Sequence, residues 1–314
     1  MPSLKEIRNR AKRAFTGRYW VSVGLLALVA LVFNLWQLTP FPYTSIGYLV
    51  ILLVGTVLTL GVLNVGMSLA RGYRLELNTV FSPFEKYGRN LGGSLWYCLF
   101  IFLWALIAMV PYLIAGIISM MNYVFSSYFR YSFYDFDYFD VQSIFADVME
   151  VMAVPIIIFA VCLSVIVIFK ALQYFCAKYV LLECPGVPAT KILNISKIMM
   201  KGEKGKLFAL AVSVLWPYYI LLILSVIFSS VGSFMNIAGE SYFTASGLTT
   251  AGTVLSVAAV VISVLYYQPY SQAAFGIFYY EVKAKALAEG KITYADLGEV
   301  PPIAPNDQTY IELN

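Results

Sequence analysis

"SPFEKYGRNLGGSLWYCLFIFLWALIAMVPYLIAGIISM", residues 82–120, joins a short polar segment to an apolar run that decides the fold class. No charged residue occurs between Leu91 and Met120. This run exceeds the roughly 20 apolar residues that an α-helix needs to cross a hydrocarbon core ~30 Å thick. The stretch therefore predicts a membrane-spanning helix that is preceded by a polar, basic segment.

The composition extends this prediction to the whole chain. Apolar residues make up 61% of the 314 residues and charged residues 12%, whereas soluble domains average about half and about a quarter. The predicted fold class is an all-α polytopic membrane protein with six spans, at about 20–37, 46–70, 91–120, 148–180, 207–233 and 251–280. Basic residues precede the first span as in a signal peptide, but no small-residue cleavage site follows Phe33, which indicates an uncleaved anchor.

The distribution of Lys and Arg predicts the orientation of the spans. Eighteen of these 21 residues lie in segments 1–19, 71–90, 183–206 and the region after the last span, whereas the opposite connections contain only Arg130. Because basic loops stay in the cytoplasm, both termini are expected there. The predicted organisation is a cytoplasmic basic helix (1–19), a six-span membrane domain (20–285) and a flexible cytoplasmic tail (286–314) with a short capped turn from Thr293 to Asp296.

Several classes of chemistry are excluded by the residue content. The chain has no His, which removes His-based acid–base and nucleophile systems. Its four Cys lie in or beside apolar segments, so no disulfide framework is expected. No Gly-rich phosphate loop occurs, and the acidic residues Glu150, Glu183, Glu240 and Glu281 are dispersed. We therefore expect a protein that is not an enzyme, with no cofactor, no catalytic or metal site and no nucleic-acid partner.

A short basic amphipathic segment precedes the first, third and fifth spans, which predicts three helix hairpins in parallel arrangement. Ser3 with Glu6, and Ser82 with Glu85, fit capping boxes, and Gly17 fits a left-handed helix end. Such helices are expected to lie in the interface with the apolar face in the acyl boundary. The alternative is that any cytoplasmic loop entering a membrane looks basic and amphipathic. The side chains expected to contact anionic lipid are Arg8, Lys12, Arg13, Lys86, Arg89, Lys201 and Lys204.

An aromatic and acidic connection, residues 121–147, is predicted on the outer side between the third and fourth spans. An EF-hand loop beginning at Asp135 fails, because positions 140 and 146 hold Asp and Ala instead of Gly and Glu. Two interpretations stay open: an anchor at the membrane interface, or a lid that recognises a lipid, peptide or partner protein. The candidate lid contacts are Tyr131, Tyr134, Asp135, Asp137 and Asp140.

Polar residues and prolines within the spans provide further candidates. Lys170, Gln173 and Gln268 could contact a ligand, although snorkelling of the Lys and interhelical hydrogen bonds are the alternatives. Prolines at 111, 155, 217 and 269 interrupt or border spans and are expected to kink them.

Segments 68–117, 171–217 and 266–284 resemble a bacterial integral-membrane family known as domain of unknown function 975. The arrangement of membrane spans in this family is also similar to that of the membrane domain of some glycerophosphodiester phosphodiesterases, and this similarity implies a connection with lipids. The resemblance implies a location in the bacterial plasma membrane and supplies no catalytic residues.

These observations favour a non-enzymatic protein that binds or transports an amphipathic molecule, either a lipid or a hydrophobic peptide. The alternative is a membrane scaffold or regulatory partner of another membrane complex. The expected partners are membrane lipids and, in the second case, a protein.

Overall fold

A computed structural model describes residues 2–37, 45–131, 141–237 and 242–299, and every element in these ranges is helical. The α-helices are α1 (Leu4–Thr16), α2 (Tyr19–Gln37), α3 (Ser45–Val50), α4 (Thr56–Arg71), α5 (Leu77–Phe81), α6 (Tyr87–Tyr131), α7 (Val141–Gln173), α8 (Phe175–Glu183), α9 (Ile192–Met199), α10 (Lys204–Ile237), α11 (Tyr242–Ile262) and α12 (Gln268–Ala288). The π-helical turns η1 (Ile51–Gly55) and η3 (Ser263–Tyr267) precede α4 and α12, and the 3₁₀ turn η2 (Ser82–Phe84) follows α5.

Five helical segments are long and apolar enough to cross a membrane, which confirms the all-α polytopic membrane fold. They are Gly47–Arg71, Tyr87–Phe125, Val151–Glu183, Lys204–Asn236 and Ser246–Ala288. The predicted first span corresponds to α2, which is long and apolar enough to cross a membrane only when it is counted together with α1. The two helices meet at an 88° bend. The described residues therefore contain five or six candidate spans, depending on whether this bent pair counts as one.

The chain divides into two compact units: unit 1 holds Met1–Ser94 and Phe175–Asn314, and unit 2 holds Leu95–Tyr174. Unit 2 contains most of α6 and all of α7. Within it the rings of Tyr112 and Phe159 pack at 5.1 Å between centroids. Only 6% of the most apolar 18-residue stretch of either helix is buried, so most of the apolar surface of unit 2 faces outward.

The spans pass through most of their prolines without a break. Pro111, Pro155 and Pro217 lie inside α6, α7 and α10. Only Pro269 borders a break, because it follows the π turn η3, where the Gln268 N–H reaches back to the Ser263 carbonyl. A proline has no N–H to donate and its ring crowds the preceding turn, which accounts for the wider turn at this position.

The spans of unit 1 cross at small residues. A Cβ on Gly276 of α12 would lie 2.5 Å from the Gly66 carbonyl oxygen of α4, and a Cβ on Gly252 of α11 would lie 2.2 Å from Ser229 Oγ of α10. Such distances require glycine, since the backbones approach too closely for any side chain.

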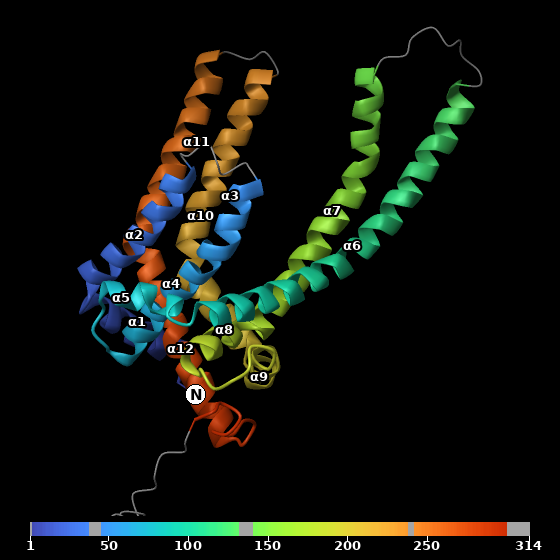
Figure 1. The fold of residues 1–314 in the computed structure, drawn as a ribbon. Coiled ribbons are helices and arrows are strands. Elements are labelled where there is room, and N and C mark those ends of the chain that lie inside the picture. Colours follow the sequence, from blue (N-terminus) through green and yellow to red (C-terminus); the bar gives the residue numbers. More distant parts are fainter. Residues whose placement is uncertain (1, 38–44, 132–140, 238–241, 300–314) are drawn as a thin grey trace, which may run out of the picture. The chain divides into compact units, whose positions relative to one another are not determined.

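Unit 1 has its core at one end, where α1, α5, α8, α9 and the last turns of α12 gather; we call this layer the base (Figure 1). Its largest fully buried side chains include Tyr179, Tyr279, Phe278, Leu181 and Met199. By contrast, only 17% of the most apolar stretch of α10 is buried. Tight side-chain packing is therefore concentrated in the base.

Two of the three predicted short helices exist, as α1 and α9, and protein covers their apolar faces. The segment before the third predicted span forms only the turn η2, after which α6 begins at Tyr87. Ile7, Ala11 and Phe15 of α1 are at most 3% exposed, and α1 packs against α12 and α4. On α9, which packs against α8, Ile192 and Met199 are at most 1% exposed. The faces expected to enter the acyl boundary are used for packing within the protein instead, because neighbouring helices supply an equally apolar partner.

The predicted caps are correct only in part. Ser3 Oγ accepts the Glu6 N–H at 3.3 Å, as expected, but the Glu6 carboxylate binds Arg10 at 2.6 Å. Gly17 has a right-handed φ of −68°, so the prediction of a left-handed residue was wrong.

The second predicted box also differs. Ser82 starts the turn η2, and its hydroxyl accepts a hydrogen bond from Asn64 at 2.8 Å. The start of α5 is capped further upstream, where the Glu76 N–H donates to Thr79 Oγ1 at 3.1 Å.

The chain after α12 is folded as far as Glu299. The Thr293 N–H donates to Asp296 Oδ2 at 2.9 Å and the Asp296 N–H donates to Thr293 Oγ1 at 3.2 Å, which confirms the predicted capped turn. Ile292 is 3% exposed and Leu297 is fully buried. The prediction of a flexible tail therefore does not describe residues 289–299, while residues 300–314 lie outside the described part.

Candidate functional site

Most candidate lid residues cannot be assigned a geometry. Tyr134, Asp135, Asp137 and Asp140 lie outside the described residues, and Tyr131 is the last residue of α6, with an undescribed side chain. The helix α6 extends eleven residues beyond the predicted end of its span at 120, so this part of the predicted connection is helical.

The structure brings two of the three polar span candidates together. Lys170 Nζ donates to Gln173 Oε1 at 3.4 Å and lies 3.3 Å from the centre of the Trp104 ring. An ammonium over an indole face is stabilised by the negative charge density of the ring. Gln268 is the first residue of α12 in unit 1 and is half-buried. Lys170 is thus accommodated within unit 2 by a ring and an amide.

The predicted lipid-binding cations fall into two groups. Lys12, Arg13, Lys86 and Lys201 are exposed, and Arg8 and Lys204 are half-buried. Arg89 instead points at the end of α8, where its guanidinium donates to the carbonyls of Leu181 (2.5 Å), Cys184 (2.8 Å) and Val187 (3.0 Å).

The last carbonyls of a helix have no partner within the helix and carry partial negative charge. Arg89 therefore caps α8, and this contact occupies the guanidinium that was expected to meet lipid.

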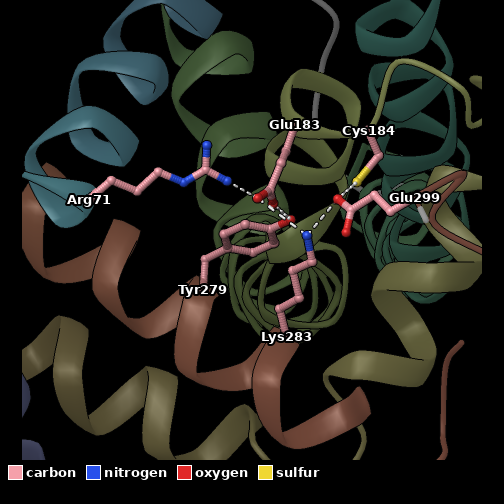
Figure 2. Close-up of polar contacts among 6 residues, drawn as sticks. All are labelled: Arg71, Glu183, Cys184, Tyr279, Lys283 and Glu299. Carbon is pink, nitrogen blue, oxygen red and sulfur yellow. Dashed lines mark hydrogen bonds and ion pairs between the residues drawn. The ribbon is translucent and has the colours of Figure 1, made fainter. Parts of the chain in front are cut away.

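The most densely connected polar cluster lies in the base and was not predicted. It joins the ends of α4, α8 and α12 to the C-terminal segment (Figure 2). The Glu183 carboxylate accepts hydrogen bonds from Arg71 and from the Tyr279 hydroxyl. Lys283 Nζ lies between two carboxylates, 3.2 Å from Glu183 Oε1 and 2.8 Å from Glu299 Oε1. Its six members are Arg71, Glu183, Cys184, Tyr279, Lys283 and Glu299.

The burial of this cluster explains why its charges are paired. The side chains of Glu183 and Lys283 are only 7% and 10% exposed. A charge removed from water is stable only with compensating charges and hydrogen bonds. The Arg71 guanidinium adds a contact with the Tyr280 ring, 4.7 Å from its centre.

Cys184 belongs to the cluster as a protonated thiol. Its Sγ donates to Glu299 Oε1 at 3.3 Å. Burial is the main cause that raises the pKa of the Cys184 thiol to about 12; Lys283 opposes this rise and the Glu299 carboxylate adds to it. Because the thiolate is the reactive form, this Cys is not activated as a nucleophile.

Glu183, Cys184 and Glu299 offer three ligand atoms within 4.8 Å of one another, a spacing that could hold a metal ion. The geometry fits an ammonium better. Lys283 bridges both carboxylates and Arg71 supplies the second positive charge, and a metal would need Cys184 as a thiolate. The cluster is therefore an ion-pair network that fastens three helices and the C-terminal segment.

A second network ties α10 to α12. The Glu203 side chain is 4% exposed and pairs with Lys206 at 3.0 Å and with Lys285. Burial by itself raises the pKa of Glu203, but hydrogen bonds from Lys285 and Lys206 outweigh it, so the pKa lies below its ordinary value of 4.5. Glu203 is thus held as a carboxylate.

Sequence reasoning treated Glu183 as one of several dispersed acids and missed its partners. A local signal exists on α12, where Tyr279 and Lys283 are four residues apart among buried residues such as Val282 and Ala286. This spacing indicates a buried polar row. The partner acid lies 100 positions earlier in the chain, so the row alone could not identify it.

The family model described as "Protein of unknown function (DUF975)" matches residues 1–286. No curated protein and no solved structure matches the chain, and nothing in these comparisons supports the similarity to the glycerophosphodiester phosphodiesterase membrane domain. Because the match covers most of the chain and includes the predicted blocks, this all-helical membrane protein belongs to the DUF975 family.

Proposed function

We propose that the protein is a non-enzymatic membrane protein that binds an amphipathic molecule, a lipid or a hydrophobic peptide, along the hairpin of α6 and α7. One observation carries this proposal: the most apolar stretches of both helices are only 6% buried, whereas the corresponding stretch of Gly47–Arg71 is 39% buried. Large contiguous apolar surfaces mark sites that are covered by another molecule. Exposed side chains such as Phe102 and Ile117 supply this surface.

The charged residues of the base support a non-enzymatic role. Glu183, Glu203 and Glu299 each pair with a Lys or Arg at the ends of packed helices. Carboxylates used in this way stabilise the fold and are neutralised by partners that an acid–base catalyst would have to lose. The base then acts as the rigid support of the spans.

We place the base and both termini in the cytoplasm and the spans in a bacterial plasma membrane. The support is the concentration of Lys and Arg at this end of the predicted spans. A thiol reagent that cannot cross the membrane tests the placement on a variant with Cys introduced at Lys12, which is exposed. Labelling in intact cells would contradict a cytoplasmic base, and labelling only after permeabilisation is expected.

The experiment for the binding proposal combines native mass spectrometry with photo-crosslinking. The protein is released gently from its own membrane, and a photoreactive residue replaces Ile117 on α6 or, as a control, Val226 on α10. The two positions are equally accessible to a crosslinking partner, because the side chains of Ile117 and Val226 are 61% and 62% exposed. We expect one discrete amphipathic adduct at position 117 and a mixture of bulk lipids at position 226. The same mixture at both positions would contradict the proposal.

A scaffold or regulatory role is the second candidate, because α6 and α7 form a unit of their own. A helix of a partner protein would cover the same apolar surface. In that case the crosslink at position 117 yields a protein adduct, and one partner co-purifies in a fixed ratio. If a discrete small molecule is found instead, its flux across vesicles containing the protein tests transport.

A further inference from the structure

Aromatic rings define a level in unit 1 where the spans meet the base. Phe15 of α1 contacts Tyr266 of η3 at 5.7 Å between ring centres, and Tyr266 contacts Tyr270 of α12 at 5.7 Å. Trp20, at the start of α2, is 78% exposed and lies 5.0 Å from Tyr19. Tyr and Trp concentrate at the headgroup region of membranes. We therefore take this aromatic level as the place where unit 1 leaves the hydrocarbon.

The helix α1 runs across this level. It meets α2 at an 88° bend, directly beside Tyr19 and Trp20. Taking α2 as the first predicted span, 20–37, we infer that α1 runs nearly parallel to the membrane surface. Its charged side chains are thus held close to the headgroups.

The contacts of α1 with α12 show which of its flanks faces the membrane. Arg10 Nη1 binds Glu281 Oε1 at 2.8 Å, and Glu281 lies eleven residues beyond Tyr270 on α12. At 1.5 Å per residue this is ~16 Å further from the aromatic level. Arg8, by contrast, lies two helical turns before Phe15, whose ring contacts Tyr266, so Arg8 is on the flank turned toward the aromatic level.

Helical spacing then assigns the other charged residues of α1. Arg8 and Lys12 are four residues apart and share the flank turned toward the aromatic level. Arg13 lines a shallow hollow with Arg10, on the side turned away from it.

The two flanks also differ in their counter-ions. Arg10 forms ion pairs with Glu6 and Glu281. Within the described part of the chain, no carboxylate forms an ion pair with Arg8 or Lys12. Two cations at the headgroup level without an internal counter-ion are complementary to the phosphates of anionic lipids.

We propose that Arg8 and Lys12 bind the phosphate of an anionic phospholipid at the junction of α1 and α2. This site lies in unit 1 and goes beyond the proposed function, which concerns α6 and α7, so either can fail without the other. Bound lipid would hold α1 against the membrane while its apolar face packs on α12.

The test is a lipid titration of the full-length protein in detergent, read by native mass spectrometry. Phosphatidylglycerol is compared with phosphatidylcholine for the wild type, for R8Q/K12Q and for the matched pair R13Q/K291Q, which removes the same charge further from the aromatic level. We expect R8Q/K12Q to weaken phosphatidylglycerol binding about thirtyfold, from about 1 kcal/mol per basic residue. R13Q/K291Q should weaken it by less than about threefold, because screening limits the effect of distant charges.

Two controls keep the result interpretable. R8K/K12R retains both charges and should bind phosphatidylglycerol like the wild type, and all variants should share one unfolding temperature. Excess inorganic phosphate should displace little lipid if the site takes a phospholipid, and full displacement would overturn that assignment in favour of free phosphate. Equal losses in both charge-removing pairs, or no loss in R8Q/K12Q, would overturn the proposal.

Discussion

The base of unit 1 and the α6–α7 hairpin of unit 2 are built on opposite principles. The base buries large aromatic side chains and pairs its charges, as in the contacts of Glu183 with Arg71 and Lys283. In the hairpin only 6% of the most apolar stretches is buried, and Lys170 rests on Trp104. The base resembles the core of a soluble protein in its packing, whereas the hairpin depends on surrounding lipid or a ligand to cover it. Substitutions of the same kind should therefore have different costs in the two regions.

The largest contrast is expected between two glycines. In Gly276→Leu the new Cβ would lie 2.5 Å from the Gly66 carbonyl oxygen, so α4 and α12 must separate. We expect a loss of about 4 kcal/mol in the free energy of unfolding, measured by SDS titration.

The matched control is Gly116→Leu on α6, where a Cβ would meet no atom within 4 Å. Because leucine favours helix more than glycine does, this variant should be at least as stable as the wild type. Equal losses in the two variants would show that the hairpin is packed as tightly as the base.

The second contrast concerns two glutamates of unit 1 that differ in burial. Glu183→Gln leaves Arg71 without its carboxylate and Lys283 with Glu299 alone. Breaking a buried ion pair costs about 3 to 5 kcal/mol, and we expect about 3 because Lys283 keeps one partner. The same SDS titration measures the change.

Glu289→Gln serves as the control, because this Glu pairs with Lys285 and Lys291 at the surface. Exposed pairs contribute little, so we expect no measurable change. If Glu183→Gln were equally silent, the network of Figure 2 would not stabilise the base.

The smallest effect is a dependence on pH. Glu203 has a pKa below 4.5 in the folded protein, so the unfolded chain binds more protons as the pH falls. Its contribution is fully present above the unfolded-state pKa and is lost as the pH falls through the folded-state pKa. We expect the unfolding temperature of the wild type to drop between about pH 5 and pH 3.

Glu203→Gln should be less stable at neutral pH and should lose less on acidification, as followed by thermal unfolding in detergent. Glu85→Gln, which removes an exposed acid, should keep the steeper wild-type dependence. Parallel curves for Glu203→Gln and the wild type would assign the acid sensitivity to other groups.

Local sequence was sufficient for the features that depend on a single helix or turn. The apolar runs predicted five segments that qualify as spans, because a helix satisfies its own backbone hydrogen bonds whatever surrounds it. The turn from Thr293 to Asp296 was predicted for the same reason, since both partners lie three residues apart.

Predictions that depended on the surroundings of a helix were less successful. The amphipathic pattern of α1 shows an apolar face, but pattern alone does not distinguish a lipid surface from α12 as the partner of that face. Arg89 looked like a lipid-facing cation, yet it caps α8 by donating to the Leu181 carbonyl, 92 residues away in the chain.

The sequence by itself determined that this is a helical membrane protein, where its spans run and which end carries the basic residues, because these properties follow from composition and from contacts within a few residues. Only the tertiary structure decided that Glu183 meets Lys283, that Gly276 meets Gly66, and that Arg10 of α1 meets Glu281 of α12. Those outcomes depend on pairings between residues far apart in the chain, where many arrangements of the same helices satisfy the same local rules.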